Sequence, residues 1–323
     1  MNEEDEGAVM DYDILTVGFP MVEIMRKQRG VTFRETADFI GPYPSADTCI
    51  VLDVASRLGK KCCLLGVAGA DVFGDLVLER LEADGTDVSS VRRVKGYPTA
   101  VVFVRYEQNG KREYLDLAAH SACTQLMSED IVEEKVKSAK WIHFSGEVLG
   151  LCMEGEAREA VLRMLELIPE SSRVSLDPNF TGTASDAYQA LKPFIDRADL
   201  ILPSEGEAAM MLGSSSDEEA CMSLADRGKI VALKRGSEGC EIFFGKERIK
   251  VPSYQVEEID PTGCGDSFCA GFLCGLIDGM PVEKAADFAN AAGALQASGF
   301  GPMEGIHSLK ELKDFMKNKE ELW

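Results

Sequence analysis

Short apolar strands alternate with helical segments through the second half of the chain, and this alternation limits the possible folds more than any other feature of the sequence. Near-continuously apolar stretches lie at 141–145, 173–177, 200–202 and 230–234. Segments with helical periodicity separate them, near 153–168, 184–194 and 217–226. Strands without polar positions are buried on both faces. The sequence therefore predicts an α/β fold whose parallel central sheet is covered by helices on both sides.

The first half begins with the same kinds of element. Buried strands are expected at 12–18 and 62–67, and helices at 72–83 and from Ser45 to Gly59. Ser45 or Asp47 is the expected N-cap of the helix that ends at Gly59, because short polar side chains accept hydrogen bonds from the first free N–H groups. Residues 20–44 have mixed polarity instead, with β-prone pieces at 31–33 and 37–40.

A hairpin is expected around Asn109-Gly110. Residues 100–107 and 112–117 alternate between apolar and polar side chains on either side of this pair, and Asn-Gly between alternating segments is the strongest short-range hairpin signal. Because these strands are half polar, unlike the others, they are expected to form a separate, exposed sheet.

The composition excludes several classes of function. With 323 residues, the chain suits one large α/β domain with an appendage or two modest domains. A formal net charge of −21 argues against nucleic acid or an anionic membrane as partner, because those surfaces bind clustered Lys and Arg. No apolar run approaches a membrane span, and the first six residues are acidic where a signal peptide is basic. A cytoplasmic location is expected.

The cysteines indicate neither a disulfide framework nor a zinc site. Five of the ten, Cys62, Cys63, Cys240, Cys269 and Cys274, lie inside apolar runs, where free thiols behave as small hydrophobic groups. No Cys-x-x-Cys pair exists and the three histidines are scattered, which argues against structural zinc.

A glycine-rich loop precedes the apolar run 268–273. Gly263 and Gly265 allow successive N–H groups to face one side, and the following helix adds the positive end of its dipole, so the loop is suited to bind phosphate. Asp266 lies on the first turn, where it could cap the helix or take the proton from an attacking hydroxyl. Cys264 is either a small packing residue or a thiol whose pKa is lowered by the helix.

Other polar residues follow the strands of the predicted sheet. Asp177-Pro178-Asn179, Ser204 with Glu207, and Gly236 with Gly239 each come directly after a strand. Because parallel strands end at one edge of a sheet, these residues are expected to meet the Gly263 loop there. Individually each has an ordinary structural explanation, such as an Asx turn at Asn179.

The segment 260–266, Asp-Pro-Thr-Gly-Cys-Gly-Asp, resembles the second signature of the PfkB/ribokinase-like carbohydrate kinases, Asp-Thr-x-Gly-Ala-Gly-Asp. Further similar stretches cover nearly the whole chain in the family's order: Gly66 to Gly74, Asp177 to Asn179, Lys234 to Gly239, and Ala289 to Ala294.

The resemblance implies a ribokinase-like fold, with a three-layer α/β/α core, a mostly parallel central sheet and a small β-sheet lid. Residues 1–323 would form a single kinase domain, with the lid built from two excursions, at about 20–45 and 97–119. Many members dimerise through the lid. A homodimer is therefore expected, with Val102, Val104 or Leu115 meeting the second copy.

The resemblance also implies an ATP-dependent sugar kinase that uses Mg²⁺, with K⁺ as a further expected ion. By motif correspondence, Asp266 would be the catalytic base, and the N–H groups of Gly263, Cys264 and Gly265 the anion hole. The other implied site residues are Lys234, Gly236, Gly239, Asn290 and Asn179 for the nucleotide; Asp47, Arg105 and Asp177 for the sugar; and Glu207, Asp260 and Thr262 for metal ions.

Two motifs depart from the family pattern. The family's Asn-x-x-Glu is Ser204 to Glu207 here, so only Glu207 corresponds. In the first signature, Ser45-Ala46 stands at the usual Gly-Gly pair and Ile50 at the usual Asn. Asp47 is the nearest polar replacement for a sugar contact.

The branch that the chain most resembles includes 2-keto-3-deoxygluconate kinases, in which arginines hold the carboxylate of an acid sugar. The corresponding positions here are Ala118 and Thr181, although Arg105 or Arg112 could substitute. The expected substrate is thus a neutral ketohexose, phosphorylated on a terminal hydroxyl. The acid-sugar kinase and a catalytically silent sugar-binding protein remain open. A dinucleotide-dependent oxidoreductase is disfavoured because no Gly-x-Gly-x-x-Gly follows the first strand.

Overall fold

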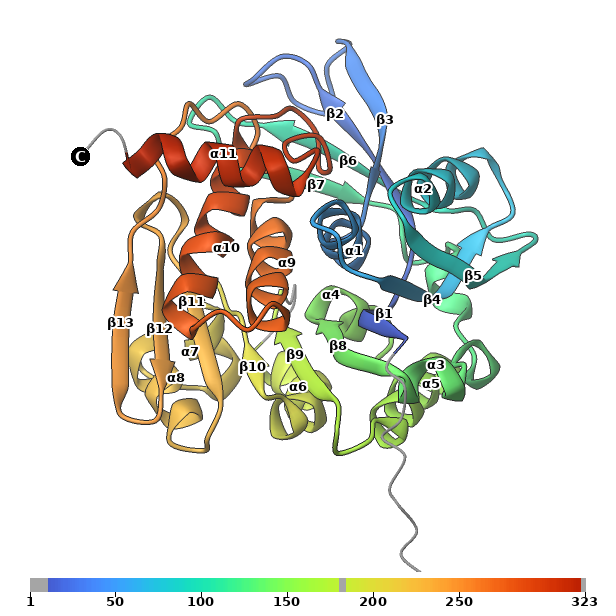
Figure 1. Cartoon of the computed structure of the whole chain (residues 1–323). Coiled ribbons are helices and arrows are strands. Elements are labelled where there is room, and N and C mark those ends of the chain that lie inside the picture. The colour runs from blue at the N-terminus through green and yellow to red at the C-terminus, as the bar shows by residue number, and fades with distance from the viewer. Residues whose placement is uncertain (1–10, 180–183, 321–323) are drawn as a thin grey trace, which may run out of the picture.

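The computed structural model describes residues 11–179 and 184–320. Within them, a large sheet has the strand order β13-β12-β11-β10-β9-β8-β1-β4-β5 (Figure 1). Its strands are β1 (Tyr12–Gly18), β4 (Cys62–Gly69), β5 (Thr86–Val94), β8 (Ala139–Ser145), β9 (Arg173–Asp177), β10 (Leu200–Ile201), β11 (Ile230–Lys234), β12 (Cys240–Phe244) and β13 (Glu247–Val251). All neighbours from β11 to β5 pair in parallel, whereas β12 and β13 form an antiparallel edge. The predicted parallel sheet is confirmed; β5, β12 and β13 were not predicted.

Helices cover both faces of this sheet. They are α1 (Asp47–Arg57), α2 (Val72–Ala83), α3 (Glu133–Lys137), α4 (Gly146–Leu151), α5 (Gly155–Leu167), α6 (Ala184–Arg197), α7 (Glu207–Leu212), α8 (Asp217–Ala225), α9 (Cys264–Ile277), α10 (Val282–Ala297) and α11 (Leu309–Glu320). Helices α1, α2, α9, α10 and α11 pack on one another on one side, and α4, α6, α7 and α8 on the other (Figure 1). The apolar strands are buried between these two layers.

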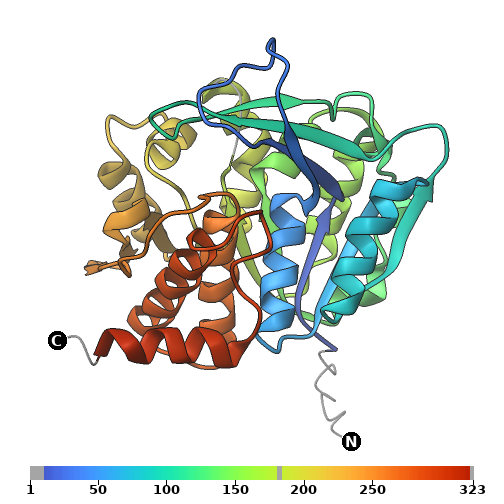
Figure 2. The same ribbon diagram turned by 90° about the horizontal axis from the view of Figure 1, so that it is seen from above.

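A second, smaller sheet has the order β3-β2-β6-β7. Its strands are β2 (Met21–Arg26), β3 (Phe39–Ser45), β6 (Ala100–Tyr106) and β7 (Arg112–Asp116). In Figure 2 it runs along the top edge of the molecule. The predicted hairpin is confirmed, since β6 and β7 pair antiparallel on either side of Asn109-Gly110.

The prediction for residues 20–44 was partly wrong. The β-prone piece at 31–33 lies in a loop that turns at Phe33, the piece at 37–40 leads into β3, and β2 was not predicted. The Arg26 side chain donates to the carbonyl oxygens of Thr32, Glu35 and Ala37, at 3.1, 2.6 and 2.6 Å. A side chain therefore satisfies backbone acceptors that a neighbouring strand would otherwise pair with.

The lid residues expected to meet a second copy do not share one face. Val104 is fully buried with Met25 and Tyr106 in a small core of its own. Val102 is two residues away and so lies on the same inner face, whereas Leu115 pairs with Phe103 on the opposite face and is 46% exposed. Of the three, only Leu115 is available to a partner.

The beginning of α1 also differs from the prediction. Neither Ser45 nor Asp47 is the N-cap: Ala46 holds that position with φ 97°, and the helix has no side-chain cap at its start. Ser45 Oγ instead donates to Glu23 Oε1 at 2.7 Å, and Asp47 Oδ1 accepts from Thr48 N at 2.6 Å. A tertiary contact thus occupies the Ser45 hydroxyl, and Asp47 Oδ1 bonds its own neighbour instead of capping the helix.

Helix α9 follows the glycine-rich loop as predicted, but its small residues serve a helix contact. A Cβ added at Gly271 would lie 2.9 Å from Ala289 Cα, and one at Gly275 would lie 2.9 Å from Ala285 Cα. Ala285 and Ala289 belong to α10, so the close approach is between α9 and α10 rather than between α9 and the sheet. All ten cysteines are free, and all but Cys264 are buried. No helix in the described ranges is long and apolar enough to cross a membrane.

Candidate active site

A cavity of about 1040 Å³ lies where the strand ends of the large sheet meet the small sheet. The large sheet contributes Asp177 at the end of β9 and Lys234 at the end of β11, and the small sheet contributes residues of β2 and β7. The loop from Pro261 to Asp266 lines the same space. The predicted convergence of strand-end residues with this loop is therefore present.

The glycine-rich loop presents backbone N–H groups at the start of α9. Gly263 is the N-cap residue, with φ 77°, and a side chain there would collide with the carbonyl oxygen of Pro302. The N–H of Cys264 makes only a long bond of 3.4 Å to Pro261 O, and those of Gly263 and Gly265 have no acceptor among the described residues. These groups are free to bind an anion.

Asp266 lies on the first turn of α9 at the cavity wall. Its side chain forms no hydrogen bond with a neighbouring residue in the described part of the chain, so it does not serve as a helix cap. Burial raises the pKa of Asp266 to about 7, and the negative charge of Asp177 adds to the rise, while Lys234 opposes it. A carboxylate with a pKa near neutrality can accept a proton at physiological pH.

Lys234 and Asp177 form a buried ion pair beneath the loop. Lys234 Nζ lies 2.6 Å from Asp177 Oδ2, and a Cβ at Gly265 would lie 3.6 Å from the same nitrogen. Burial would lower the pKa of Lys234, but the Asp177 carboxylate outweighs this and raises it. The positive charge of Lys234 is thus held under the anion-binding loop and already neutralised by a carboxylate.

Asp177 also presents an oxygen with no partner. Its Oδ1 is buried and accepts no hydrogen bond in the structure. Burial and the charge of Asp177 both raise the pKa of Glu207, although Glu207 does not line the cavity and its Oε2 accepts from Ser204 N at 2.7 Å. The charge of Asp177 thus acts on Glu207, and the orphan Oδ1 of Asp177 is the kind of oxygen ligand that a divalent cation such as Mg²⁺ prefers.

Asp260 is fully buried at the start of the loop. Its Oδ1 accepts from Tyr106 Oη at 2.8 Å and from the N and Oγ1 of Thr262 at 3.0 and 2.7 Å, while Oδ2 accepts from Gly301 N at 3.0 Å. No basic residue in the described ranges forms an ion pair with it. Neutral hydrogen-bond donors therefore stabilise the Asp260 carboxylate, and one of them, Tyr106, belongs to the small sheet.

The residues assigned to the nucleotide differ in their position in the cavity and in their contacts. Gly236 and Gly239 line the cavity with φ of 52° and 100°, in the turn that joins β11 to β12. Asn290 also lines it, but its Nδ2 donates to Val251 O and Pro252 O, which anchors the segment after β13. Asn179 Nδ2 points to Asp47 Oδ2 at 3.4 Å, which groups it with the sugar-side residues rather than with the nucleotide-side residues.

Acidic residues dominate the part of the cavity beside Asp47. Asp47 N lies 3.4 Å from Glu147 Oε2, and burial together with the Glu147 charge raises the pKa of Asp47. Burial also raises the pKa of Glu23 to about 7, while the hydrogen bond from Ser45 opposes the rise. Glu23 is 8% exposed, and its Oε2 has no partner among the described residues. Glu23 and Glu147 were not predicted as site residues.

Arg105, expected to contact the sugar, faces away from the cavity. In the β6–β7 register, Arg105 pairs with Glu113, and their side chains form an ion pair on the outer face. Arg112 pairs with Tyr106 and lies on the inner face with Tyr114 and Asp116, all three of which line the cavity. Alternation along the hairpin strands predicts that Arg105 and Arg112 face opposite sides, but it does not show which side meets the cavity.

Cys264 does not have the lowered pKa considered from the sequence. Burial raises the pKa of its thiol to about 12, and the nearby Asp260 charge adds to this, whereas Arg112 opposes it. Desolvation and carboxylates outweigh the helix dipole at this position. Cys264 is a small packing residue of the loop. The position of Thr181, considered for an arginine, lies outside the described residues.

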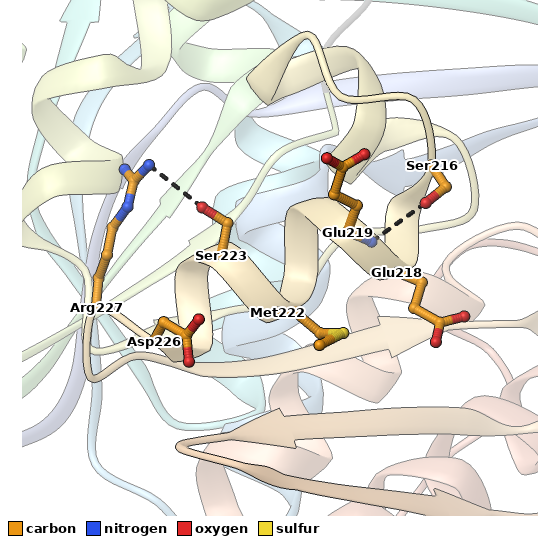
Figure 3. A pocket seen from close by; sticks show the side chains of 7 residues that line it. All are labelled: Ser216, Glu218, Glu219, Met222, Ser223, Asp226 and Arg227. Carbon is orange, nitrogen blue, oxygen red and sulfur yellow. Dashed lines mark hydrogen bonds between the residues drawn. The ribbon is translucent and has the colours of Figure 1, made fainter.

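A second, shallow pocket lies on the surface of α8 (Figure 3). Its polar side chains are occupied by local contacts: Ser216 Oγ accepts from Glu219 N at 3.2 Å, and Arg227 donates to Ser223 Oγ at 3.4 Å. Figure 3 shows its carboxylates spread around the helix rather than aimed at a common point. This pocket offers no catalytic arrangement.

Comparison with known proteins identifies the family of the chain. A family model described as pfkB family carbohydrate kinase matches residues 48–309. Fructokinase-1 of rice, Oryza sativa subsp. japonica, is 28% identical over 319 residues, which cover 94% of this chain and 98% of the rice protein.

Solved structures are similar over nearly the full length. An E. coli protein provisionally described as a ribokinase II, in complex with ATP and Mg²⁺, has a TM-score of 0.88 and 31% identity, covering 95% of this chain and 99% of its own. A fructokinase from Vibrio cholerae O395, with fructose, ADP and calcium ion bound, has a TM-score of 0.82, with the same coverage of each chain. Its identity of 22% makes it a likeness of fold alone.

Proposed function

Because this chain belongs to the pfkB family of carbohydrate kinases and is a sugar kinase, we propose that it transfers the γ-phosphoryl group of ATP to a terminal hydroxyl of a neutral ketohexose. The observation that carries the proposal is Asp266, a carboxylate with a pKa of about 7, on the same helical turn as the free N–H groups of the glycine loop. A base and an anion hole on one turn suit phosphoryl transfer to a hydroxyl.

In the proposed reaction, Asp266 takes the proton of the sugar hydroxyl while that oxygen forms a bond to the γ-phosphorus. The bond from the γ-phosphorus to the β–γ bridging oxygen breaks, and ADP leaves with that electron pair. The N–H groups of Gly263, Cys264 and Gly265 donate to oxygens of the transferred group, whose negative charge is greatest in the transition state. Lys234 supports the loop from below.

We propose that Glu207 would hold Mg²⁺ through water and that Asp177 would contribute its orphan Oδ1, because the charge of Asp177 acts on Glu207 and this oxygen has no partner among the described residues. When bound, Mg²⁺ neutralises charge on the ATP oxygens. The E. coli relative with ATP and Mg²⁺ supports the use of both by this chain. Gly236, Gly239 and Asn290 would lie beside the nucleotide.

The acidic sugar side supports an uncharged substrate. Glu23, Asp47 and Glu147 line that part of the cavity, and a carboxylate placed among them would be repelled. Hydroxyl groups of a neutral sugar can instead donate to these oxygens, including the orphan Oε2 of Glu23. Fructokinases among the relatives also favour a ketohexose.

A coupled assay of ADP formation over a sugar panel tests the proposal. The panel contains fructose, tagatose, ribose and 2-keto-3-deoxygluconate, each with Mg²⁺ and ATP. A neutral ketohexose is expected to have the highest kcat/KM. If no sugar stimulates ADP formation although ATP binds, the chain is a sugar-binding protein rather than a kinase.

One observation favours a second candidate function, 2-keto-3-deoxygluconate kinase. Arg112 lines the cavity from β7, and a guanidinium is the natural partner of a carboxylate. A kcat/KM for 2-keto-3-deoxygluconate above that for every neutral sugar in the panel would establish this alternative.

A K⁺ ion beside the anion hole is a further part of the proposal. Asp260 is fully buried without a basic partner in the described ranges, and its Oδ2 accepts from Gly301 N alone there. A monovalent cation could share that oxygen and tighten the loop. Activity should be higher in K⁺ than in tetramethylammonium at equal ionic strength, and equal rates in the two salts would contradict the site.

A further inference from the structure

Gln296 is a fully buried polar residue at the end of α10, and it is not part of the cavity lining. Helix α10 packs closely along α9, which begins at the anion-binding loop (Figure 1). Burying a glutamine costs side-chain entropy, and its amide group must find hydrogen-bond partners there. The groups that bind this amide therefore show what the side chain holds in place.

The Gln296 amide connects two backbone segments. Its Nε2 donates to Thr262 O at 3.1 Å and to Gly301 O at 2.7 Å, and its Oε1 accepts from Gly305 N at 3.0 Å. Because a carbonyl oxygen only accepts and a backbone N–H only donates, these partners admit one orientation of the amide. Gln296 thus uses both of its N–H groups to fasten the anion-binding loop to residues 301–305.

The bond to Thr262 O determines the direction of the first N–H group of the anion hole. Thr262 O and Gly263 N belong to the same peptide group, which is planar and trans, so its C=O and N–H point in opposite directions. The N–H of Gly263 is therefore held pointing away from Gln296. Gly263 lines the cavity, whereas Gln296 lies behind the loop.

This peptide group is the part of the loop that would reorient most easily. It precedes Gly263, whose φ is 77°, and glycine accepts φ of either sign at little cost. Asp260 binds the N and Oγ1 of Thr262, at 3.0 and 2.7 Å, but these bonds do not fix the carbonyl that follows. Among the described residues, the recorded donor to Thr262 O is Gln296.

The second segment bound by the amide packs directly on the loop. A Cβ added at Gly263 would lie 2.2 Å from Pro302 O, and Gly301 N donates to Asp260 Oδ2 at 3.0 Å. Because Gln296 holds Gly301 O as well as Thr262 O, the loop and the segment behind it are fixed relative to each other by one side chain.

We propose that Gln296 is a positioning residue for phosphoryl transfer, which holds the Gly263 N–H toward the transferred group. The inference rests on the proposed kinase function and adds to it a residue that touches neither substrate. A reversed peptide group would present a carbonyl oxygen to the anion in place of a donor. Because the donor acts most strongly where negative charge builds up, its correct orientation lowers the barrier more than it tightens ground-state binding.

A matched control separates this role from stability alone. Lys229 is also a buried side chain that donates to two carbonyl groups, Asp196 O at 3.0 Å and Ala198 O at 2.8 Å. It precedes β11, at the end of the sheet opposite to the cavity. Lys229→Met should lower the melting temperature and leave kcat at the wild-type level.

The test variants are Gln296→Met, which keeps the length of the side chain without its donors, and Gln296→Asn, which keeps an amide with a shorter reach. With the best sugar of the panel, Gln296→Met is expected to lower kcat about tenfold, less than the roughly 10²-fold lost when such a donor is removed outright. KM for the sugar should change less than about threefold. Gln296→Asn should have an intermediate kcat. Circular dichroism confirms that each protein is folded at the assay temperature.

A binding measurement makes the test independent of the sugar. ADP alone and ADP with aluminium fluoride, a mimic of the transferring phosphoryl group, are titrated with Mg²⁺ into each protein by calorimetry. Gln296→Met should bind ADP as the wild type does, but should bind ADP–aluminium fluoride at least about fivefold more weakly. Lys229→Met should bind both as the wild type does.

Each contrary outcome has a distinct meaning. A folded Gln296→Met protein with a lower melting temperature and the wild-type kcat overturns the inference, because Gln296 then serves stability alone. An equal loss of affinity for ADP and ADP–aluminium fluoride, or no binding of the mimic by the wild type, overturns it as well. If Gln296→Met does not fold, the same comparisons decide with Gln296→Asn. If no sugar is turned over but the affinities for the mimic differ as expected, the positioning role stands and the sugar-kinase proposal fails.

Discussion

The pKa of Asp266 depends on two neighbouring charges that act in opposite directions. Burial and Asp177 raise its pKa to about 7, while Lys234, paired with Asp177, limits the rise. Without Lys234, burial and Asp177 would raise the pKa of the Asp266 carboxyl group unopposed. The ion pair beneath the loop thus adjusts the base as well as supporting the backbone.

We expect Asp266→Asn to keep the fold and ATP binding and to lower kcat by about 10²-fold to 10⁴-fold, the usual contribution of general-base catalysis. An amide has nearly the shape of the carboxyl group but cannot take the proton. Steady-state kinetics, with ATP affinity and melting temperature as controls, measure this. Turnover near the wild-type level would remove the assigned role.

The same residue determines the expected pH profile. The base is active when deprotonated, so wild-type kcat/KM should fall about tenfold per pH unit below pH 7 and level off above it. Glu23 also has a pKa raised to about 7, by burial. Glu23→Gln is therefore the control, and its kcat/KM should still fall below pH 7. If this fall is absent in Glu23→Gln, the titrating group is Glu23 and not Asp266.

Ala46 has a backbone conformation that suits glycine better. Its φ of 97° and ψ of 137° lie in a region that residues with a Cβ rarely adopt, and it stands where the first signature of the family has its Gly-Gly pair. We expect Ala46→Gly to raise the free energy of unfolding by about 1 kcal/mol, because relief of strain exceeds the extra entropy of the unfolded chain.

Urea denaturation measures the effect of Ala46→Gly. The control is Ala55→Gly further along α1, where the backbone is helical and glycine should instead lower stability by about 1 kcal/mol. A loss of stability in both variants would show that the N-terminus of α1 tolerates Ala46 without strain.

The small sheet and the glycine-rich loop are connected by one side chain of β6. Tyr106 is 4% exposed, and its hydroxyl reaches Asp260 at 2.8 Å and Thr262 Oγ1 at 3.4 Å. Asp260 in turn holds Thr262 N. The position of β6 over the cavity is thus linked to the backbone of the anion hole through a buried carboxylate.

Tyr106→Phe is expected to leave Asp260 with one donor fewer, a loss of about 1.5–3 kcal/mol for a hydrogen bond to a charged group. If the bond positions the loop, kcat should fall about tenfold with KM for ATP nearly unchanged, because the anion hole acts most strongly on the transition state. Kinetics and thermal unfolding together separate positioning from general stability.

The control for Tyr106→Phe is Tyr43→Phe. Tyr43 packs on Phe300 with ring centroids 5.9 Å apart, and its hydroxyl forms no hydrogen bond among the described residues. It should keep the wild-type kcat. If Tyr106→Phe is less stable but keeps the wild-type kcat, the hydrogen bond stabilises the fold and does not position the loop.

The outer face of the small sheet carries exposed apolar side chains. Phe39 is 40% and Leu115 46% exposed, and Phe39 stacks edge-on with Phe103 at 5.4 Å between centroids. Exposed strands with apolar side chains pair with other chains unless they are covered. We propose that a second copy of the chain covers the outer face of the small sheet.

Leu115→Glu should convert a homodimer at micromolar concentration into a monomer, since a carboxylate is costly to bury in an apolar contact. Light scattering on the wild type and the variant measures this. Met222→Glu is the control, because Met222 is 52% exposed on α8, away from the small sheet. A wild-type protein that is strictly monomeric would refute the interface.

The local pattern of the sequence determined the layers of the fold. Apolar runs of strand length, separated by helical periodicity, could only be buried in a covered parallel sheet, and strands such as β8, β9 and β11 lie where the pattern places them. Asn109-Gly110 determined the hairpin, and Gly263 determined the helix start. Asp266 could be identified because one short motif contains the loop, the helix and the base together.

Only the tertiary structure decided which side of each element meets the cavity. Strand alternation places Arg105 and Arg112 on opposite faces of the hairpin, but it does not reveal which face is turned to the cavity. In the structure, the face that carries Arg112 lines the cavity. The contacts Lys234–Asp177, Ser45–Glu23 and Tyr106–Asp260 join residues 57, 22 and 154 positions apart. Periodicity is local to one element, whereas the charge that a buried side chain meets depends on elements brought beside it by folding.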